Sequence, residues 1–90
     1  MHLKYKFVVQ TFFKKDIVAV PVGKEAKEYN SMLKLNQTGG RIIELLDNDT
    51  TEDAIIDTIC AEFDADRETV SADVRNFLRM LDDKGLLVNE

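Results

Sequence analysis

The chain of 90 residues has no tryptophan, a single cysteine, a single proline and a single histidine. Cys60 has no partner for an internal disulfide, and together with His2 it is too little for a Cys/His metal site. No apolar run reaches about 18 residues, which excludes a membrane-spanning helix, and the start MHLKYKFVVQ lacks the apolar core of a secretory signal. We therefore expect a cytoplasmic protein with no membrane contact, no metal and no cofactor.

Residues suited to catalysis are equally scarce. His2 lies near a terminus that we expect to fray, and Cys60 falls on the apolar face of a predicted helix, so neither has a base or nucleophile beside it. The paired glycines Gly39 and Gly40 are not followed by the lysine of a phosphate-binding loop. Neighbouring carboxylates such as those in the Asp82 and Asp83 pair diverge on a helix. We expect that this chain is not an enzyme.

The net charge of −5 is distributed unevenly along the chain. Seven lysines and three acidic residues give residues 1–34 a net charge of +4, whereas residues 35–90, with five basic and fourteen acidic residues, carry −9. An acidic second half disfavours nucleic-acid binding through that half, because such binding depends largely on neutralising phosphates. A solvated surface without any partner explains the same distribution almost as well.

The first 35 residues have the patterns of β-strands. Four apolar residues alternate with other residues near the start: Leu3, Tyr5, Phe7 and Val9. This two-residue period predicts a strand over residues 3–13. The β-branched run at residues 17–22, ending at Pro21 and Gly23, predicts a second strand that forms a hairpin with the first.

Residues 29–35 predict a third strand by the same alternation. One face would carry Tyr29, Ser31, Leu33 and Leu35, and the other face would carry Asn30, Met32 and Lys34. If this strand is an open edge of the sheet, its backbone can accept a further strand from another molecule. The alternatives are that the edge is covered or simply hydrated.

Three helices are predicted after this strand. Asn36 is a suitable N-cap for a helix over residues 37–47, whose apolar stripe consists of Ile42, Ile43, Leu45 and Leu46. Paired glycines in its first turn suggest the close approach of another backbone, and a loose helix start explains them equally well.

The second and third predicted helices are also capped. Thr50 and Asp53 resemble a capping box for a helix with one apolar face, namely Ala54, Ile55, Ile59, Cys60 and Phe63. Asp66 would cap the third helix, and Gly85 would end it. Its buried stripe would be Val70, Val74, Phe77, Leu78 and Leu81. Residues 86–88 would form a short strand or a packed tail.

These elements predict one α+β domain over residues 1–90, with a three-stranded antiparallel sheet followed by three helices. The last two helices have the short connection of a helix-turn-helix, so a winged helix-turn-helix that binds DNA is one alternative. Arg67, Arg75, Arg79 and Lys84 would supply its positive charge, although the spacing from Arg79 to Asp83 is that of an ordinary surface ion pair. The isoelectric point near 4.8 disfavours the DNA alternative.

Two long segments resemble the PqqD family of pyrroloquinoline quinone biosynthesis proteins: NSMLKLNQTGGRIIELLDND and TTEDAIIDTICAEFDADRETVSADVRNFLRMLDDKGLL. The shared features are a strand ending in LN-x-TG, a helix ending in LLD, a T-x-E-[DE] helix start and a final helix of the pattern D-V-x-x-[FL]-L-x-x-L-x-x-x-G-L-[LV]. The segment DIVAVPVG also matches the second strand of the family. Gly40 departs from the pattern, because many relatives have a larger residue there.

The resemblance implies a winged-helix-like fold and a non-catalytic role in recognising precursor peptides. Members of this family bind the leader segment of a ribosomally made peptide as an extra strand and present it to a modifying enzyme, commonly a radical S-adenosylmethionine (SAM) enzyme. Carried over to this chain, the peptide site would consist of Lys27, Tyr29, Asn30, Ser31, Met32, Leu33, Lys34, Asp73, Val74, Phe77 and Met80. Lys27 and Lys34 would favour an acidic leader. The chain itself would be a monomer or a weak homodimer, paired through an open edge or by strand exchange.

Overall fold

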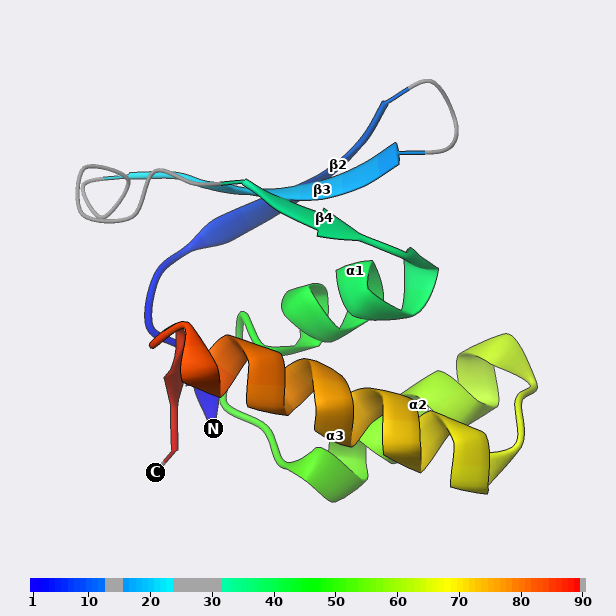
Figure 1. Cartoon of the computed structure of the whole chain (residues 1–90). Coiled ribbons are helices and arrows are strands. Elements are labelled where there is room, and N and C mark those ends of the chain that lie inside the picture. The colour runs from blue at the N-terminus through cyan, green and yellow to red at the C-terminus, as the bar shows by residue number, and fades with distance from the viewer. Residues whose placement is uncertain (13–15, 24–31, 90) are drawn as a thin grey trace.

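The computed structural model describes residues 1–12, 16–23 and 32–89. Its main sheet is antiparallel and consists of β2 (Phe7–Phe12), β3 (Asp16–Pro21) and β4 (Leu33–Leu35), with β3 in the centre (Figure 1). The order β2-β3-β4 leaves β2 and β4 as the two edges of this sheet among the described residues. The predicted hairpin is therefore present, and the third strand lies at an edge of the sheet.

Three helices follow the sheet and lie on one side of it, with α1 between the sheet and the pair of α2 and α3 (Figure 1). They are α1 (Gln37–Leu45), α2 (Glu52–Phe63) and α3 (Arg67–Asp83). The predicted class, an α+β fold with a three-stranded antiparallel sheet and then three helices, is confirmed. Within the described part of the chain, no helix combines the length and the apolar character needed to cross a membrane.

The prediction of one strand over residues 3–13 is wrong. The chain instead forms a short strand β1 (His2–Leu3), which pairs with β5 (Leu87–Val88), and enters the main sheet only at Phe7. The backbone N–H of Leu3 donates to the carbonyl of Leu46, and that of Lys4 donates to the carbonyl of Leu86. These bonds hold the start of the chain to the ends of two helices, and an alternating pattern cannot distinguish one strand from two strands of different sheets.

Each helix begins at a side-chain cap. The side-chain oxygen of Asn36 accepts from the N–H of Gly39, and that of Asp66 accepts from the N–H of Thr69, as predicted. The cap of α2 is Thr51 and not Thr50, because the Thr51 hydroxyl accepts from the N–H of Ala54. After α3, Gly85 has φ +73°, the left-handed conformation that closes a helix at low cost.

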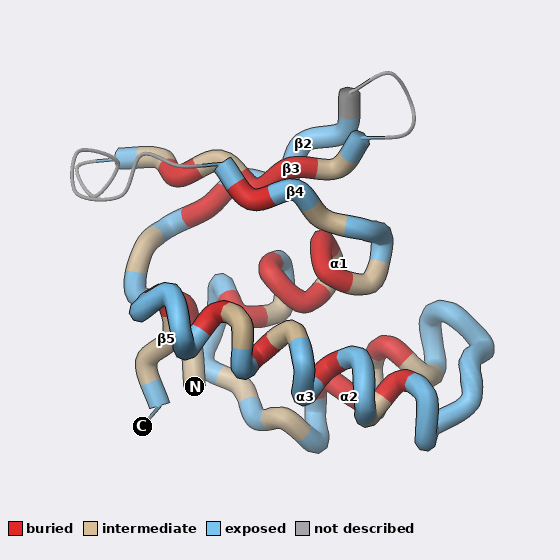
Figure 2. Tube along the Cα trace, in the orientation of Figure 1, coloured by how far each residue is buried: buried red, intermediate tan, exposed pale blue. Residues whose placement is uncertain are grey.

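The core extends from the inner face of the sheet through α1 to the interface between α2 and α3, and the surfaces that face one another are buried (Figure 2). Its centre is formed by fully buried residues from the sheet, the helices and the C-terminal segment: Ala19, Ile42, Ile55, Ile59, Val74, Leu81 and Leu86. The apolar face predicted for the second helix is partly wrong. Ala54 is exposed and Phe63 is 39% exposed, whereas Ile56 is buried. Cys60 is half-buried and packs against the core.

Candidate functional site

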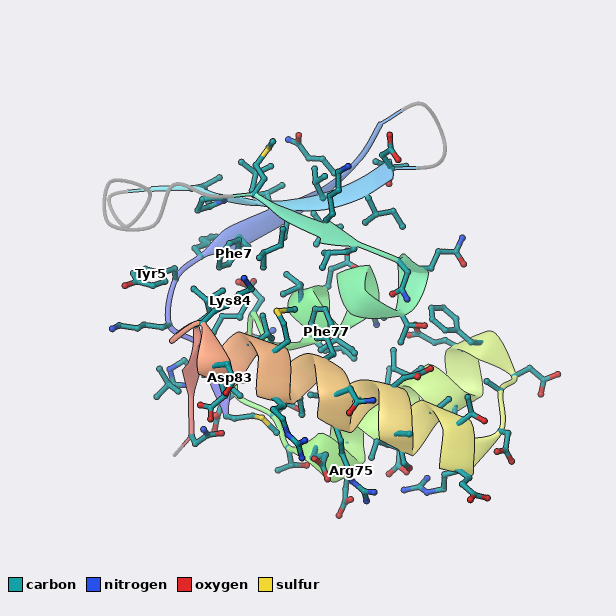
Figure 3. All side chains as sticks on the ribbon, viewed as in Figure 1. Tyr5, Phe7, Arg75, Phe77, Asp83 and Lys84 are labelled. Carbon is teal, nitrogen blue, oxygen red and sulfur yellow. The ribbon has the colours of Figure 1, made fainter. Side chains whose placement is uncertain are left out.

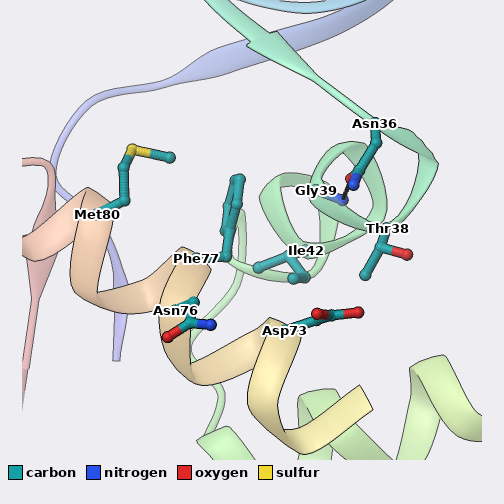
Figure 4. Close-up of a pocket in the computed structure, with 8 residues that line it drawn as sticks. All are labelled: Asn36, Thr38, Gly39, Ile42, Asp73, Asn76, Phe77 and Met80. Carbon is teal, nitrogen blue, oxygen red and sulfur yellow. Dashed lines mark hydrogen bonds between the residues drawn. The ribbon is translucent and has the colours of Figure 1, made fainter. Parts of the chain in front are cut away.

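A groove of about 350 Å³ lies between the start of α1 and the middle of α3 (Figure 4). One wall consists of Asn36, Thr38, Gly39 and Ile42, and the other consists of Asp73, Asn76, Phe77 and Met80. The floor is apolar, since Ile42 is fully buried and both Phe77 and Met80 pack against the core. The rim is polar and carries amide, hydroxyl and carboxylate groups. The groove therefore combines an apolar bottom with hydrogen-bonding groups at its opening.

The α1 wall is shaped by its N-terminal cap. The Asn36 side-chain oxygen accepts from the N–H of Gly39 at 2.7 Å, which fixes the first turn beside the end of β4. A Cβ atom on Gly39 would lie 2.9 Å from Cε1 of Phe77, closer than carbon atoms pack. Gly39 is thus needed for the approach of the Phe77 ring. The structure places side chains, and not another backbone, against the paired glycines.

The α3 wall follows from helical spacing. Asp73, Phe77 and Met80 recur at intervals of four and three residues, so they share one face of the helix. Phe77 points from α3 toward α1, whereas Arg75 points to the opposite side of the helix (Figure 3). Asp73 is exposed, and no ion pair joins its carboxylate to another of the described residues. A negative charge is therefore available on the rim of the groove.

The hydrogen-bonding pattern of the sheet determines which backbone groups face the open edge of β4. The N–H of Val22 donates to the carbonyl of Lys6, and bonded pairs between β2 and β3 recur at every second residue from there. The intervening residues of β3 bond to β4, where Ala19 opposes Leu33 and Ile17 opposes Leu35. The N–H and C=O of Lys34 consequently point away from β3, toward the open edge.

Comparison with protein-family models matches residues 17–87 to the family described as Coenzyme PQQ synthesis protein D (PqqD). The chain belongs to the PqqD family. Among solved structures, it is similar to a chain from the structure described as TbiB1 in complex with the TbiA(beta) leader peptide. That similarity has a TM-score of 0.71 and 31% sequence identity, and it covers 100% of this chain and 98% of the other. The search of curated proteins found no match.

The structure of this PqqD-family chain brings together some of the predicted peptide-site residues. Asp73, Phe77 and Met80 line the groove, but Val74 is fully buried and lies in the core beneath it. On the sheet side, Leu33 is buried, whereas Lys34 is exposed and Met32 is 63% exposed. The remaining four predicted residues, Lys27, Tyr29, Asn30 and Ser31, lie outside the described residues.

Sequence reasoning missed the α1 side of the groove. Asn36 was predicted only as a helix cap, and Thr38, Gly39 and Ile42 were not assigned to the site. The available signal was the pair of glycines in the first turn, which suggested the close approach of another backbone and not of the Phe77 ring. Asn76 was also missed, although it lies one position before Phe77 on α3 and lines the groove.

The arginines of α3 have acidic surroundings. Arg67 Nη1 lies 2.6 Å from Asp57 Oδ1, and Arg75 Nε lies 3.4 Å from Glu52 Oε2, so α2 neutralises both. The predicted pair between Arg79 and Asp83 is not among the ion pairs of the described residues. Charge neutralisation by α2 disfavours phosphate contacts by Arg67 and Arg75, which weakens the DNA-binding alternative.

Proposed function

We propose that this chain binds the leader segment of a ribosomally synthesised precursor peptide as an additional strand on β4, and delivers it to a modifying enzyme of the radical SAM class. The proposal rests above all on one observation: the open edge of β4 runs directly into the capped turn that forms one wall of the groove. Support also comes from the structural relative, which is in complex with a leader peptide. The chain itself would carry out no chemistry on the peptide.

The backbone of the guest would bond to the N–H and C=O groups that point outward at Lys34 and, by the same alternation, at Met32. These bonds provide affinity without regard to sequence. Selectivity would come from guest side chains that enter the groove between Gly39 and Phe77, where Met80 offers a flexible apolar surface. In this arrangement Asp73 would meet a polar or basic group of the guest at the rim.

The wider set of contacts remains as predicted from the sequence. Lys27, Tyr29, Asn30, Ser31 and Leu33 would continue the docking strand on either side of Met32. Val74 would act indirectly, because it is buried and holds α3 against the core. Lys34 is exposed beside the edge, so an acidic guest residue there would strengthen association, and added salt would weaken this contribution.

Titration of the ¹⁵N-labelled chain with the TbiA(beta) leader peptide tests the binding step. We expect amide shifts at Met32–Asn36 and along the groove face of α3, including Asp73 and Phe77. Unchanged amides in both segments, with this peptide and with leaders from genes adjacent to that of this chain, would contradict the proposal. Delivery is tested separately by measuring modification of the peptide by its enzyme with and without this chain. We expect modification only when the chain is present.

Proline substitution separates edge binding from folding. Met32→Pro removes an N–H that points outward, so peptide binding should fall at least tenfold while the sheet persists. Leu33→Pro is the matched control, because the Leu33 N–H faces β3 and its loss should reduce the stability of the fold itself. Equal loss of folding in both variants would show that the Met32 edge is structural and not free for a guest.

A further inference from the structure

The second edge of the sheet, β2, differs in composition from the edge proposed for the guest. Its sequence FVVQTF contains no charged residue, no proline and no glycine over six positions. Exposed edges are normally protected by charges, prolines or very short strands, because an uncharged edge is a template for pairing. β4 has two of these protections, since it is three residues long and carries Lys34. β2 has none of them along its length.

Val9 and Thr11 of β2 present backbone groups at this edge. Bonded pairs with β3 fall at Val8, Gln10 and Phe12, by alternation from the bond between Val22 and Lys6. The N–H and C=O groups of Val9 and Thr11 therefore point away from β3. Within residues 1–12, 16–23 and 32–89, neither residue makes a backbone hydrogen bond outside the sheet.

Apolar surface accompanies these groups on both faces of the edge. On the outer face, Val8 is 39% exposed. Below the inner face lies a hollow of about 430 Å³, lined by Val9, Thr11, Ile17, Gln37, Gly40, Arg41, Glu44 and Phe63. Phe63 is the exposed aromatic residue at the end of α2 and is also 39% exposed. Two of the three large hydrophobic residues that are exposed in the described structure thus flank the β2 edge.

We propose that β2 pairs with β2 of a second copy of this chain, in antiparallel orientation about a two-fold axis near Gln10. Val9 of one copy would lie opposite Thr11 of the other, and the two symmetry-related pairs would exchange roughly four hydrogen bonds. Each Phe63 would cover the inward side chains of the new strand pair from below. Val8, which is exposed on the outer face, would lie at the edge of the new strand pair.

Charge and symmetry favour a second copy over a foreign strand. A two-fold axis at Gln10 brings the two copies of Gln10 together and places Val9 opposite Thr11, and none of these residues carries a charge that would repel its neighbour. The same pairing through β4 would bring two copies of Lys34 together. Pairing through β2 also leaves β4 as the outer edge in both copies, so the groove lined by Phe77 stays open for a peptide.

The dimer would be weak. A strand of six residues is about 20 Å long, and together with Phe63 and Val8 it supplies less than the roughly 800 Å² per partner of a standard stable interface. Lys4 and Lys6 lie just before the strand and are exposed, so each end of the interface carries positive charge. Each copy has a net charge of −5, and salt should strengthen the dimer by screening the repulsion between the copies.

Sedimentation equilibrium from about 10 µM to about 1 mM protein tests the proposal, because weak association appears only across such a range. We expect the average mass of the wild-type chain to rise toward that of two chains, and to rise further at higher salt. Thr11→Pro removes an outward N–H without breaking a bond to β3, so it should lower the dimer fraction about tenfold. Phe63→Ala should lower it less, and circular dichroism should show both variants folded.

Met32→Pro is the matched control, because it changes the other edge and should leave dimerisation unchanged. A wild-type chain that stays monomeric to about 1 mM would overturn the proposal. So would a folded Thr11→Pro variant that dimerises normally, or a folded Met32→Pro variant that does not dimerise. If Thr11→Pro fails to fold, Thr11→Lys decides in its place by adding an edge charge. Peptide-induced shifts at Val9 and Thr11, with the mass remaining that of one chain, would identify a foreign strand as the occupant instead.

Discussion

The two edges of the main sheet have the same backbone chemistry but different surroundings. β4 is short, carries Lys34 and borders a groove closed by Phe77 and Met80 of α3. β2 is twice as long, has no charge and borders a hollow closed by Phe63 of α2. Helix α1 contributes residues to both cavities, so it forms a wall between them.

This difference suggests how one small sheet can keep peptide binding and dimerisation on separate edges. An edge that must accept varied peptides benefits from few pairing residues and from a groove that selects side chains. An edge that meets an identical strand needs no selective groove and can use uniform apolar contact. Substitutions that affect one edge and not the other test whether the two proposed uses are separate.

The largest effect is expected at Ile42, which supports both edges through α1. This side chain is fully buried and also lines the floor of the peptide groove. Ile42→Ala should lower the free energy of unfolding by about 2–5 kcal/mol, since it removes packed methyl groups and leaves a cavity. Urea titration would measure this loss. Peptide binding and dimerisation should both weaken, and retention of both would show that α1 is not their shared support.

The paired glycines offer a sharper comparison, because each faces a different cavity. A methyl group on Gly39 would lie 2.9 Å from Phe77, whereas one on Gly40 would lie 3.1 Å from Ile17 Cγ2 and 3.5 Å from Val9 Cγ1. Gly39→Ala should displace the Phe77 ring and weaken peptide affinity about tenfold, or ~1.4 kcal/mol. Gly40→Ala should disturb the β2 side more and leave peptide affinity nearly unchanged.

Calorimetry with the peptide and sedimentation of both variants would measure these two effects. The conservative size of both substitutions makes each a control for the other. If Gly39→Ala and Gly40→Ala altered the two activities equally, the two cavities would not act independently.

Asn36 should contribute a smaller amount, because it acts as a cap at an exposed helix end. Asn36→Ala removes the oxygen that accepts from the N–H of Gly39, and it should lower the free energy of unfolding by about 1 kcal/mol. Asn36→Asp keeps an accepting oxygen and should restore most of this loss. An Asn36→Ala variant as stable as the wild type would contradict the role of this cap.

The smallest effect concerns the ion pair between α1 and α2 beside the β2 hollow. Arg41 bonds both carboxylate oxygens of Glu62 at 2.8 Å, and these bonds hold the pKa of Glu62 below its ordinary value of 4.5. Because the folded pKa is lowered, the pair stabilises the fold above the pKa of the unfolded chain. This stability is lost as the pH falls through the folded pKa of Glu62.

Arg41→Met should therefore return the pKa of Glu62 toward 4.5 and flatten the acid dependence of unfolding in this range. Titration of the side-chain carboxyl signals by NMR would measure the shift. A pKa of Glu62 that stays below 4.5 in the Arg41→Met variant would show that another group, and not Arg41, stabilises the Glu62 carboxylate.

Local features of the chain were predictable because they depend on neighbouring residues. The stripe of α3, the caps at Asn36 and Asp66 and the closing glycine Gly85 each act within one or two turns of a helix. The family motifs are likewise continuous in the sequence, and the resemblance to the PqqD family is confirmed by the match over residues 17–87. The order of the three main-sheet strands and the three helices therefore followed from the sequence alone.

Only the tertiary structure decided which residues meet across elements. It divided the predicted first strand between two sheets, left Phe63 exposed beside β2 and brought the Phe77 ring against Gly39. Such contacts depend on how layers are packed, and no local period encodes the distance between residues 38 positions apart. The sequence by itself thus determined the elements and the family, whereas long-range packing determined the groove and the two open edges.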